Sequence, residues 1–411
     1  MGFPAVAKAG ADTKAMSQSF IESVSGLVRR IKASVKRSRP SPVLYNVNAV
    51  NEGSPRRRAL LMYLVRPFLL SADAPEFLVH QNLRHCRQIA ILLGEFNYIV
   101  DVTDVSNRQF KPKVAYDLVL KDSLRLEHFE PAPNGTIRLL LATTMDHVVH
   151  NRNLLRRHQQ LFQRRGHRLQ IRRLYGEKMP YAAEADAIVG VGNEYTAKTW
   201  RQSSRAKIYP FNNSGFPEIR FIFDSKDFAA ARTNFLFFAS GSQVQKGLDL
   251  LLDIFPHLPD LKLYICSGFE SEADFCACYH RELFETPNIR SLGWVRVNRP
   301  EFYQLVTQCA YVIYPSCSDG QAGSVVNCMH AGLIPVVTRE AGIDTDDFGV
   351  TFVDDSLDEI ERVVVQLAGL PETWHQEHSL KTRKVAEERY SEAAFMTRWR
   401  DILTEVLPGG G

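Results

Sequence analysis

The sequence lacks any apolar run long enough to span a bilayer, which takes roughly 20 helical residues. The best candidate, residues 59–70, is shorter and is interrupted by Arg66 and Pro67. No apolar segment of the kind found in secretion signals follows Met1. These absences predict a cytoplasmic protein.

Cysteine pairs with the spacing of a redox or zinc motif are also missing. The seven cysteines are scattered, and Cys276 and Cys278 are separated by one residue rather than two. We therefore expect buried thiols in a reducing compartment. Asp344–Asp347 matches a DxD-type metal motif by letters alone and is more typical of a solvated loop, so we expect no metal cofactor.

Most of the chain lacks a strong charge of one sign. The net charge is +4, but residues 1–58 hold eleven Lys/Arg and three Asp/Glu, a net of +8, which leaves −4 for the remainder. The body of the protein is therefore not expected to bind nucleic acid. The basic character is confined to the N-terminal arm.

That arm contains an apolar stripe at helical spacing within residues 16–36, with basic residues on the other face. Such a helix can lie on an anionic membrane surface, with peripheral contact through residues 16–39. It can equally dock on its own domain or form an oligomer contact. Residues 38–42 contain two prolines and predict a linker after it.

A chain of 411 residues is too long for one ordinary core, so two α/β domains are expected. Buried-strand patterns around a helical segment open a β–α–β unit, which is typical of a doubly wound parallel sheet. Its expected strands are 59–65, 97–103, 137–142 and 187–191, and its expected helices are 83–93 and 151–165.

A second α/β repeat begins near residue 234. Its expected strands are 235–238, 261–265, 311–314 and 334–337, and its expected helices are 248–254, 273–283, 300–308, 324–331 and a final amphipathic helix over 386–407. We predict an extension over 1–55, one domain over 56–215, a second over 216–385, and a C-terminal helix and tail over 386–411. Loops at the carboxyl ends of the parallel strands would line a cleft between the domains.

The strongest chemical pattern lies between residues 315 and 337. A strand is followed by a glycine-containing loop, a helix, a glycine stop and another strand. Gly320 and Gly323 allow close backbone approach to a ligand, and Ser324 opens a helix whose free N–H groups favour a diphosphate. Asp319 and Asn327 would both be reachable from the cleft. An ordinary tight turn between a strand and a helix would have the same sequence pattern.

This stretch resembles the donor-site signature of GT-B retaining glycosyltransferases of family four, the glycosyl transferases group 1. Their pattern is Pro-Ser-x-x-Glu-Gly-x-Gly, a second Glu eight residues after the first, and then Ala-x-Gly-x-Pro-Val-Val. Asp319 stands at the first glutamate and Asn327 at the second, and the matching frame is Pro315, Ser316, Gly320, Ala331, Gly332, Pro335, Val336 and Val337.

The resemblance implies that the first carboxylate touches the transferred sugar and that the second binds the ribose hydroxyls. Asp319 is one methylene shorter than glutamate, and Asn327 is no longer a purely accepting anion. The resemblance also places Gln321, Ala322 and Glu340 at the donor, the last within a loop that follows strand 334–337.

A second match covers residues 238–252 and is similar to the family's strand, glycine loop and Lys-Gly helix start. Lys246 and Gly247 are in place, preceded by Ser240, but Gly241 stands where the family has an arginine. A lysine at this position would neutralise the departing diphosphate. One cationic contact is therefore missing or comes from elsewhere in the chain. Residues 288–295 are similar to the family's turn on the nucleobase side.

The acceptor side is less distinctive. Asn193 and Glu194 follow a segment similar to the family's last acceptor-domain strand. His147 follows the strand after which the family often presents a cleft histidine, with His150 nearby, although a lone loop histidine is more often solvated. His80 and Asn82 lie between the first strand and its helix.

The resemblance implies transfer of a sugar from a UDP- or GDP-sugar to a glycan or lipid-linked acceptor, with retention and without an obligatory metal. Asp319, His147 and Lys246 are the expected catalytic residues. A GT-B scaffold that binds a sugar nucleotide or a partner without transfer is the main alternative, and an epimerase or phosphorylase is a third. A basic N-terminal helix on a membrane would place the protein at the inner face.

Overall fold

The computed structural model describes residues 42–48, 56–123, 135–176 and 180–408. The helix expected over 16–36, and its contact with a membrane, lie outside the described residues. Within those four ranges, no helix has the length and apolarity needed to cross a membrane.

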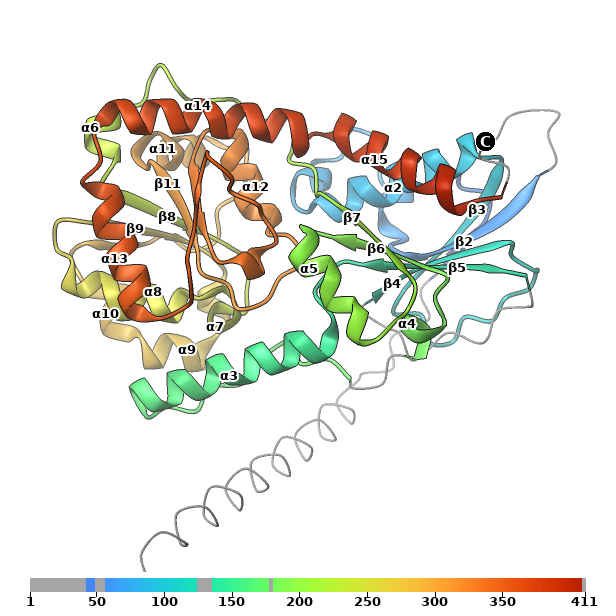
Figure 1. The fold of residues 1–411 in the computed structure, drawn as a ribbon, viewed down its shortest axis with the longest axis horizontal. Coiled ribbons are helices and arrows are strands. Elements are labelled where there is room, and N and C mark those ends of the chain that lie inside the picture. Colours follow the sequence, from blue (N-terminus) through green and yellow to red (C-terminus); the bar gives the residue numbers. More distant parts are fainter. Residues whose placement is uncertain (1–41, 49–55, 124–134, 177–179, 409–411) are drawn as a thin grey trace, which may run out of the picture. The chain divides into compact units, whose positions relative to one another are not determined.

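The first sheet follows the predicted doubly wound pattern. Its seven strands run in the order β1-β3-β2-β4-β5-β6-β7, and every pairing is parallel except that of β1 with β3. The strands are β1 (Val43–Leu44), β2 (Arg57–Tyr63), β3 (Tyr98–Asp104), β4 (Leu118–Asp122), β5 (Ile137–Ala142), β6 (Ala187–Val191) and β7 (Lys207–Phe211). Helices α2 (Gln81–Glu95), α3 (His147–Arg165), α4 (Pro180–Glu184) and α5 (Glu194–Lys198) connect them (Figure 1).

The second sheet has six parallel strands in the order β10-β9-β8-β11-β12-β13. They are β8 (Asn234–Phe238), β9 (Lys262–Cys266), β10 (Ile289–Ser291), β11 (Tyr311–Tyr314), β12 (Ile334–Val337) and β13 (Val350–Thr351). Its helices are α6 (Phe228–Ala231), α7 (Gln243–Lys246), α8 (Leu248–Ile254), α9 (Ala273–Cys278), α10 (His280–Phe284), α11 (Pro300–Gln308), α12 (Gly323–His330), α13 (Leu357–Ala368) and α14 (Glu372–Arg389). The predicted fold class, two Rossmann-like sheets, is confirmed.

The last helix, α15 (Glu392–Val406), returns to the first sheet. Phe395, Trp399 and Ile402 are buried in one cluster with β2, β3 and β5 side chains. This confirms the prediction that a C-terminal helix closes back on the first domain. We call the first sheet with α2–α5 and α15 the N-terminal lobe, and the second sheet with α6–α14 the C-terminal lobe.

Two predicted helices are each divided. The helix expected over 386–407 is the end of α14 and the whole of α15, because Ser391 leaves the helix and caps α15 by accepting from Ala394 N–H at 3.2 Å. The helix expected over 273–283 is broken at Tyr279, whose ring is fully buried. Strands β1, β4, β7 and β13 were not predicted: β1 and β13 have only two residues each, β4 carries Lys121 and Asp122, and β7 carries Pro210.

Helix α3 follows a strand of the N-terminal lobe but pairs with carboxylates of the C-terminal lobe. Arg157 is fully buried and lies 3.8 Å from Asp249 and 2.9 Å from Asp355. The remaining ion pairs are Arg156–Asp355 at 2.7 Å, Arg164–Asp249 and Arg164–Asp253 at 2.7 Å, Arg165–Asp253 at 2.5 Å and Arg165–Glu282 at 2.8 Å. These ion pairs join α3 to the C-terminal lobe, along which the helix runs (Figure 1).

Candidate functional site

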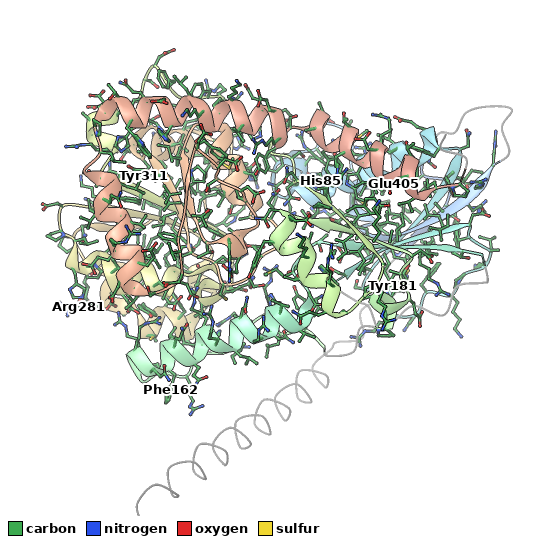
Figure 2. All side chains as sticks on the ribbon, viewed as in Figure 1. His85, Phe162, Tyr181, Arg281, Tyr311 and Glu405 are labelled. Carbon is green, nitrogen blue, oxygen red and sulfur yellow. The ribbon has the colours of Figure 1, made fainter. Side chains whose placement is uncertain are left out.

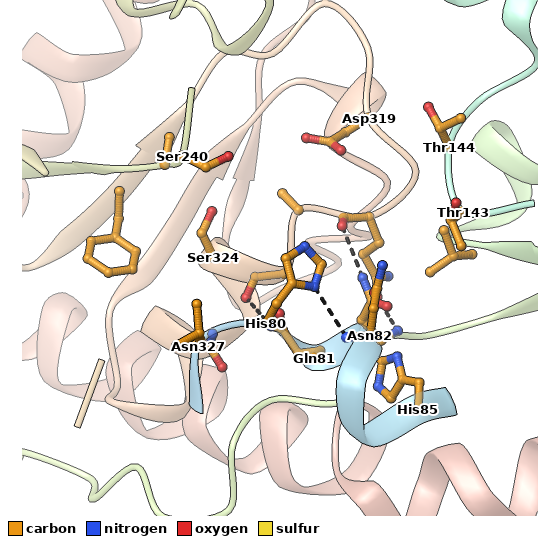
Figure 3. Close-up of a pocket in the computed structure, with 18 of the residues that line it drawn as sticks. His80, Gln81, Asn82, His85, Thr143, Thr144, Ser240, Asp319, Ser324 and Asn327 are labelled. Carbon is orange, nitrogen blue, oxygen red and sulfur yellow. Dashed lines mark hydrogen bonds between the residues drawn. The ribbon is translucent and has the colours of Figure 1, made fainter. Parts of the chain in front are cut away.

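A cavity of about 310 Å³, here called the cleft pocket, is lined by residues of both lobes. The N-terminal lobe contributes the start of α2, residues 143–144 after β5, and Arg173 and Tyr175. The C-terminal lobe contributes the loops after β8, β10 and β11 and the start of α12. These are the carboxyl ends of parallel strands, where ligands bind in open α/β sheets (Figure 3).

Three side chains of the C-terminal lobe form a cluster in the wall of this pocket. The Asp319 carboxylate forms an ion pair with the Lys246 ammonium and accepts from the Tyr314 hydroxyl at 2.8 Å. Lys246 is the last residue of α7, and Tyr314 ends β11, directly before the loop that carries Asp319. The predicted pair of a lysine and a carboxylate is therefore brought together.

The ionisation states of this cluster follow from burial and from each other. Burial raises the pKa of Asp319, but the Lys246 charge and hydrogen bond, with Arg173 and Tyr314, outweigh it and the pKa is lowered. Burial lowers the pKa of Lys246, and Asp319 opposes that shift. Burial and Asp319 raise the pKa of Tyr314 well above its ordinary value, so its hydroxyl stays a neutral donor. The carboxylate is held ionised between two donors.

The start of α12 opens onto the cleft pocket, as predicted for a diphosphate site. Gln321, Ala322, Gly323 and Ser324 all line the pocket, as does Ser240 across from them. Gln81 at the start of α2 donates to Gly323 O at 2.9 Å, and a Cβ on Gly323 would lie 2.6 Å from the Gln81 amide nitrogen. Glycine at 323 thus lets the two lobes approach at this helix start.

Gly320 has a different place from the one expected. It does not line the pocket, and a Cβ there would lie 2.5 Å from Val191 Cγ1 and 2.7 Å from Thr143 O. Gly342 packs on it so closely that a Cβ on Gly342 would lie 1.8 Å from Gly320 O. The small residue therefore serves contact between backbones of the two lobes. Its contact with a donor stays a prediction.

Asn327, at the second glutamate position, lines the pocket and is 4% exposed. Its Oδ1 accepts from the Phe216 N–H at 3.1 Å, so the oxygen is committed to the segment that joins the lobes. No residue within the described ranges accepts from its Nδ2. The pocket is therefore offered an amide donor at this position, and contact of Asn327 with a ribose stays a prediction.

The structure does not place His147 in the lining of the pocket. It is the first residue of α3, its ring is stacked on Tyr175 with centroids 4.0 Å apart, and it is 4% exposed. Tyr175 lines the pocket in its stead. The catalytic role predicted for His147 is not supported by this position. His150 is also buried, with Nδ1 2.8 Å from Ser318 Oγ and Nε2 2.8 Å from Arg173 O.

The remaining predicted residues divide into two groups. His80 and Asn82 line the pocket, with His80 Nδ1 accepting from the Asn82 N–H at 3.2 Å as the cap of α2. The others do not line it. Glu340 accepts from the Tyr195 hydroxyl at 3.0 Å, Asn193 caps α5 and donates to Asp344 at 2.9 Å, Glu194 pairs with Lys198, and Gly241 and Gly247 flank α7.

Sequence reasoning missed Arg173 and Arg296, which both line the pocket. Arg173 belongs to a segment, 167–176, without regular structure, after a long basic helix. No spacing or motif distinguishes it from the surface arginines around it. Arg296 follows the turn with Trp294, and its guanidinium lies 5.9 Å from the indole centroid.

Comparison with known families and proteins gives one family match. Residues 232–369 match the family described as Glycosyl transferases group 1. These residues contain α7, the Asp319 loop and α12. No curated protein matches the sequence.

Solved structures share the fold. Sucrose-phosphate synthase from Thermosynechococcus elongatus is 11% identical with a TM-score of 0.59, over 85% of this chain and 99% of that one. Anabaena HepE in complex with UDP-glucose is 14% identical with a TM-score of 0.56, over 85% and 100%. WaaG, a glycosyltransferase involved in lipopolysaccharide biosynthesis, is 11% identical with a TM-score of 0.52, over 86% and 100%. A TarM structure is spanned over 54% of its length, with a TM-score of 0.48. The likeness confirms the predicted GT-B arrangement.

Proposed function

We propose that this chain transfers a sugar from a nucleoside diphosphate sugar to an acceptor, because residues 232–369 match the family described as Glycosyl transferases group 1 and the chain has the GT-B fold. The observation that carries the proposal is the Lys246–Asp319 pair beside the start of α12 in the wall of the cleft pocket. This arrangement provides a cation, a carboxylate and free helix N–H groups within one cavity.

In the proposed reaction, the bond between the anomeric carbon and the β-phosphate oxygen breaks, and the nucleoside diphosphate leaves with the bonding electrons. Lys246 and the N–H groups of α12 stabilise the negative charge that develops on that oxygen. The acceptor hydroxyl attacks from the same face and its proton passes to the leaving phosphate, which gives retention. Asp319, held by Lys246 and Tyr314, orients the sugar.

The donor proposed is a UDP- or GDP-sugar. HepE holds UDP-glucose in its solved structure, so UDP-hexoses come first in a donor panel. The acceptor proposed is a glycan or a lipid-linked glycan. Peripheral contact through residues 16–39, at the inner face of a membrane, is tested by liposome co-sedimentation of the whole chain against a chain without residues 1–40.

The test of the function is sugar transfer or donor hydrolysis across a panel of nucleotide sugars, followed by the anomeric configuration of the product. Lys246→Ala is expected to lower kcat by about a hundredfold or more, because one preorganised donor to the developing charge is lost. Lys198→Ala is the matched control, since Lys198 is an exposed lysine paired with Glu194 outside the pocket. Equal activity of Lys246→Ala and wild type would remove Lys246 from the site.

A second candidate is a scaffold that binds a sugar nucleotide or a partner without transfer. The commitment of Asn327 Oδ1 to the Phe216 backbone, at a position where the family has a free carboxylate, favours it. Nucleotide binding measured by calorimetry, without turnover of any donor in the panel, would select this candidate.

A further inference from the structure

The cleft pocket lacks one cation relative to the family pattern, since Gly241 stands at the arginine position. Three cationic side chains line the pocket: Arg173, Lys246 and Arg296. Lys246 is paired with Asp319, and Arg296 lies over the Trp294 ring. A diphosphate carries two or more negative charges, and the Lys246–Asp319 pair is neutral overall. Arg173 and Arg296 are the cations left to match it, and of the two only Arg173 comes from the lobe opposite Lys246.

The Arg173 side chain is exposed in this pocket. No described residue forms a hydrogen bond or an ion pair with its guanidinium. Its neighbour Arg172 behaves differently, because it pairs with Asp274 at 2.5 Å and with Glu272 at 3.3 Å. Arg172 therefore anchors the segment, and Arg173 is directed to the cavity.

The backbone around Arg173 is held on both sides. Arg173 has φ 62°, a left-handed conformation that is unfavourable for a residue other than glycine. Its carbonyl accepts from His150 Nε2 at 2.8 Å, and Asn151 and Tyr175 exchange two hydrogen bonds of 3.0 Å. Gln170 N–H donates to Asp274 at 2.7 Å. These bonds fix where the side chain leaves the backbone.

The charge of Arg173 reaches the Lys246–Asp319 pair. Burial raises the pKa of Asp319; among the charges that lower it, Arg173 comes next after Lys246. It also contributes, after burial, to the lowered pKa of Lys246. A guanidinium in that range, with five donors in a planar fork, suits a phosphate better than an ammonium does.

We propose that Arg173 binds the diphosphate of the donor from the N-terminal lobe, in place of the arginine that the family carries at position 241. The inference rests on the proposed function, because it takes a nucleoside diphosphate sugar as the ligand. In this arrangement Lys246 would reach the diphosphate from the C-terminal lobe and Arg173 from the N-terminal lobe. Charge stabilisation therefore becomes complete only when both lobes contribute.

The direct test is calorimetric titration of the full chain with UDP and with UMP, and with GDP and GMP if the uridine nucleotides do not bind. Arg173→Ala is expected to weaken UDP binding about tenfold or more, as for a lost hydrogen bond to a charged group, and to change UMP binding much less. Arg173→Lys keeps the charge and is expected to lose less. Arg152→Ala is the matched control, because Arg152 is an exposed arginine of α3 that does not line the pocket.

A rescue variant tests whether the two positions share the role. A Cβ on Gly241 would meet Glu272 Oε1 at 3.5 Å, an ordinary contact, and Gly241 has no positive φ, so the backbone there accommodates a Cβ. Gly241→Arg in the Arg173→Ala background is expected to recover a large part of the lost UDP affinity. A double variant no better than Arg173→Ala would overturn the equivalence of the two positions.

The proposal as a whole is overturned if Arg173→Ala, with an unchanged circular dichroism spectrum, binds UDP as tightly as wild type. It is likewise overturned if the variant loses only affinity for the acceptor, seen as a raised acceptor KM with unchanged UDP binding. If the wild-type chain binds neither UDP nor GDP, the proposed function and this inference both fall, and that result differs from the two before it.

Discussion

At the scale of single residues, Tyr314 and Tyr311 lie on the same strand and have different partners. Tyr314 donates to the Asp319 carboxylate at 2.8 Å in the cleft pocket. Tyr311, in the C-terminal lobe (Figure 2), donates to Leu367 O at 2.9 Å and also forms a hydrogen bond with His375. It does not line the pocket. One hydroxyl therefore serves the site and the other serves packing of the C-terminal lobe.

Tyr314→Phe is expected to lower kcat for transfer by about tenfold, because a hydrogen bond to a charged group is worth about 1.5 kcal/mol or more. Donor KM should change little, since the hydroxyl positions Asp319. Tyr311→Phe, the control on the same strand, should lower the unfolding free energy and leave kcat unchanged. Steady-state kinetics and urea unfolding of both variants check this. Equal kinetic effects would contradict the assignment.

The sequence could predict the residues of the site that belong to a motif. Lys246, Asp319, Ser324 and Asn327 stand at fixed spacings around a strand, a loop and a helix, and the structure places all four at one cavity. Arg173 could not be predicted, because its position depends on a segment without regular structure that bonds to His150 and Asn151 on α3.

At the scale of elements, two glycines end helices in the left-handed conformation, Gly247 after α7 and Gly166 after α3. Gly247 joins α7 to α8 with φ 84°, and a Cβ there would lie 2.3 Å from Pro315 O. Gly166 ends α3 with φ 70°, and a Cβ there would meet nothing within 4 Å. Both positions have a left-handed backbone conformation, which favours glycine. Only at Gly247 is there also no room for a Cβ.

Gly166→Ala is expected to lower the unfolding free energy by about 1 kcal/mol, the cost of the backbone conformation alone. Gly247→Ala should cost clearly more, about 2 kcal/mol or beyond, because the clash with Pro315 displaces the start of the loop that carries Asp319. It should also reduce transfer, since Lys246 precedes it. Urea unfolding of both variants measures the difference. Equal losses of unfolding free energy in the two variants would show that the contact with Pro315 does not affect stability.

Elements were predictable where the apolar pattern is regular, as in β8, β11, β12 and α11, whose bounds are those expected to within a residue. The end of α14 could not be predicted in this way. The apolar spacing continues past Tyr390 into α15. The break comes from Ser391, which caps α15, and from the backbone oxygen of Tyr390. That oxygen accepts from the Gly215 N–H and lies 3.1 Å from His330 Nε2. Those partners are distant in sequence.

At the scale of the whole molecule, buried histidines link stability to pH. Burial lowers the pKa of His85 to about 3 and the pKa of His150 and His158 to about 4. The unfolded chain takes up these protons near pH 6.5, and the folded chain takes them up only near pH 3–4. Unfolding therefore becomes easier as the pH falls. Asp249, with its pKa raised by burial to about 6, acts in the opposite direction for one proton.

For His85, His150, His158 and Asp249 taken together, the unfolded state binds about two more protons than the folded state near pH 5. These four groups should therefore lower the unfolding free energy by about 3 kcal/mol for each pH unit that the pH falls there. Urea unfolding at pH 7, 6 and 5 measures it. His158→Gln should reduce that slope by about one proton, which is about 1.4 kcal/mol per pH unit. A stability that is constant between pH 7 and 5 would contradict the neutral state of these histidines.

Helix α3 belongs to one lobe by its place in the chain and to the other by its contacts. A fragment that ends before residue 232 would keep Arg156, Arg157, Arg164 and Arg165 and lose all four of their acidic partners. The complementary fragment would expose Asp249, which is fully covered in the intact chain. We therefore expect each of these two fragments to fold less stably than the intact chain, and an exchange of C-terminal lobes between related chains would have to carry α3 along with that lobe.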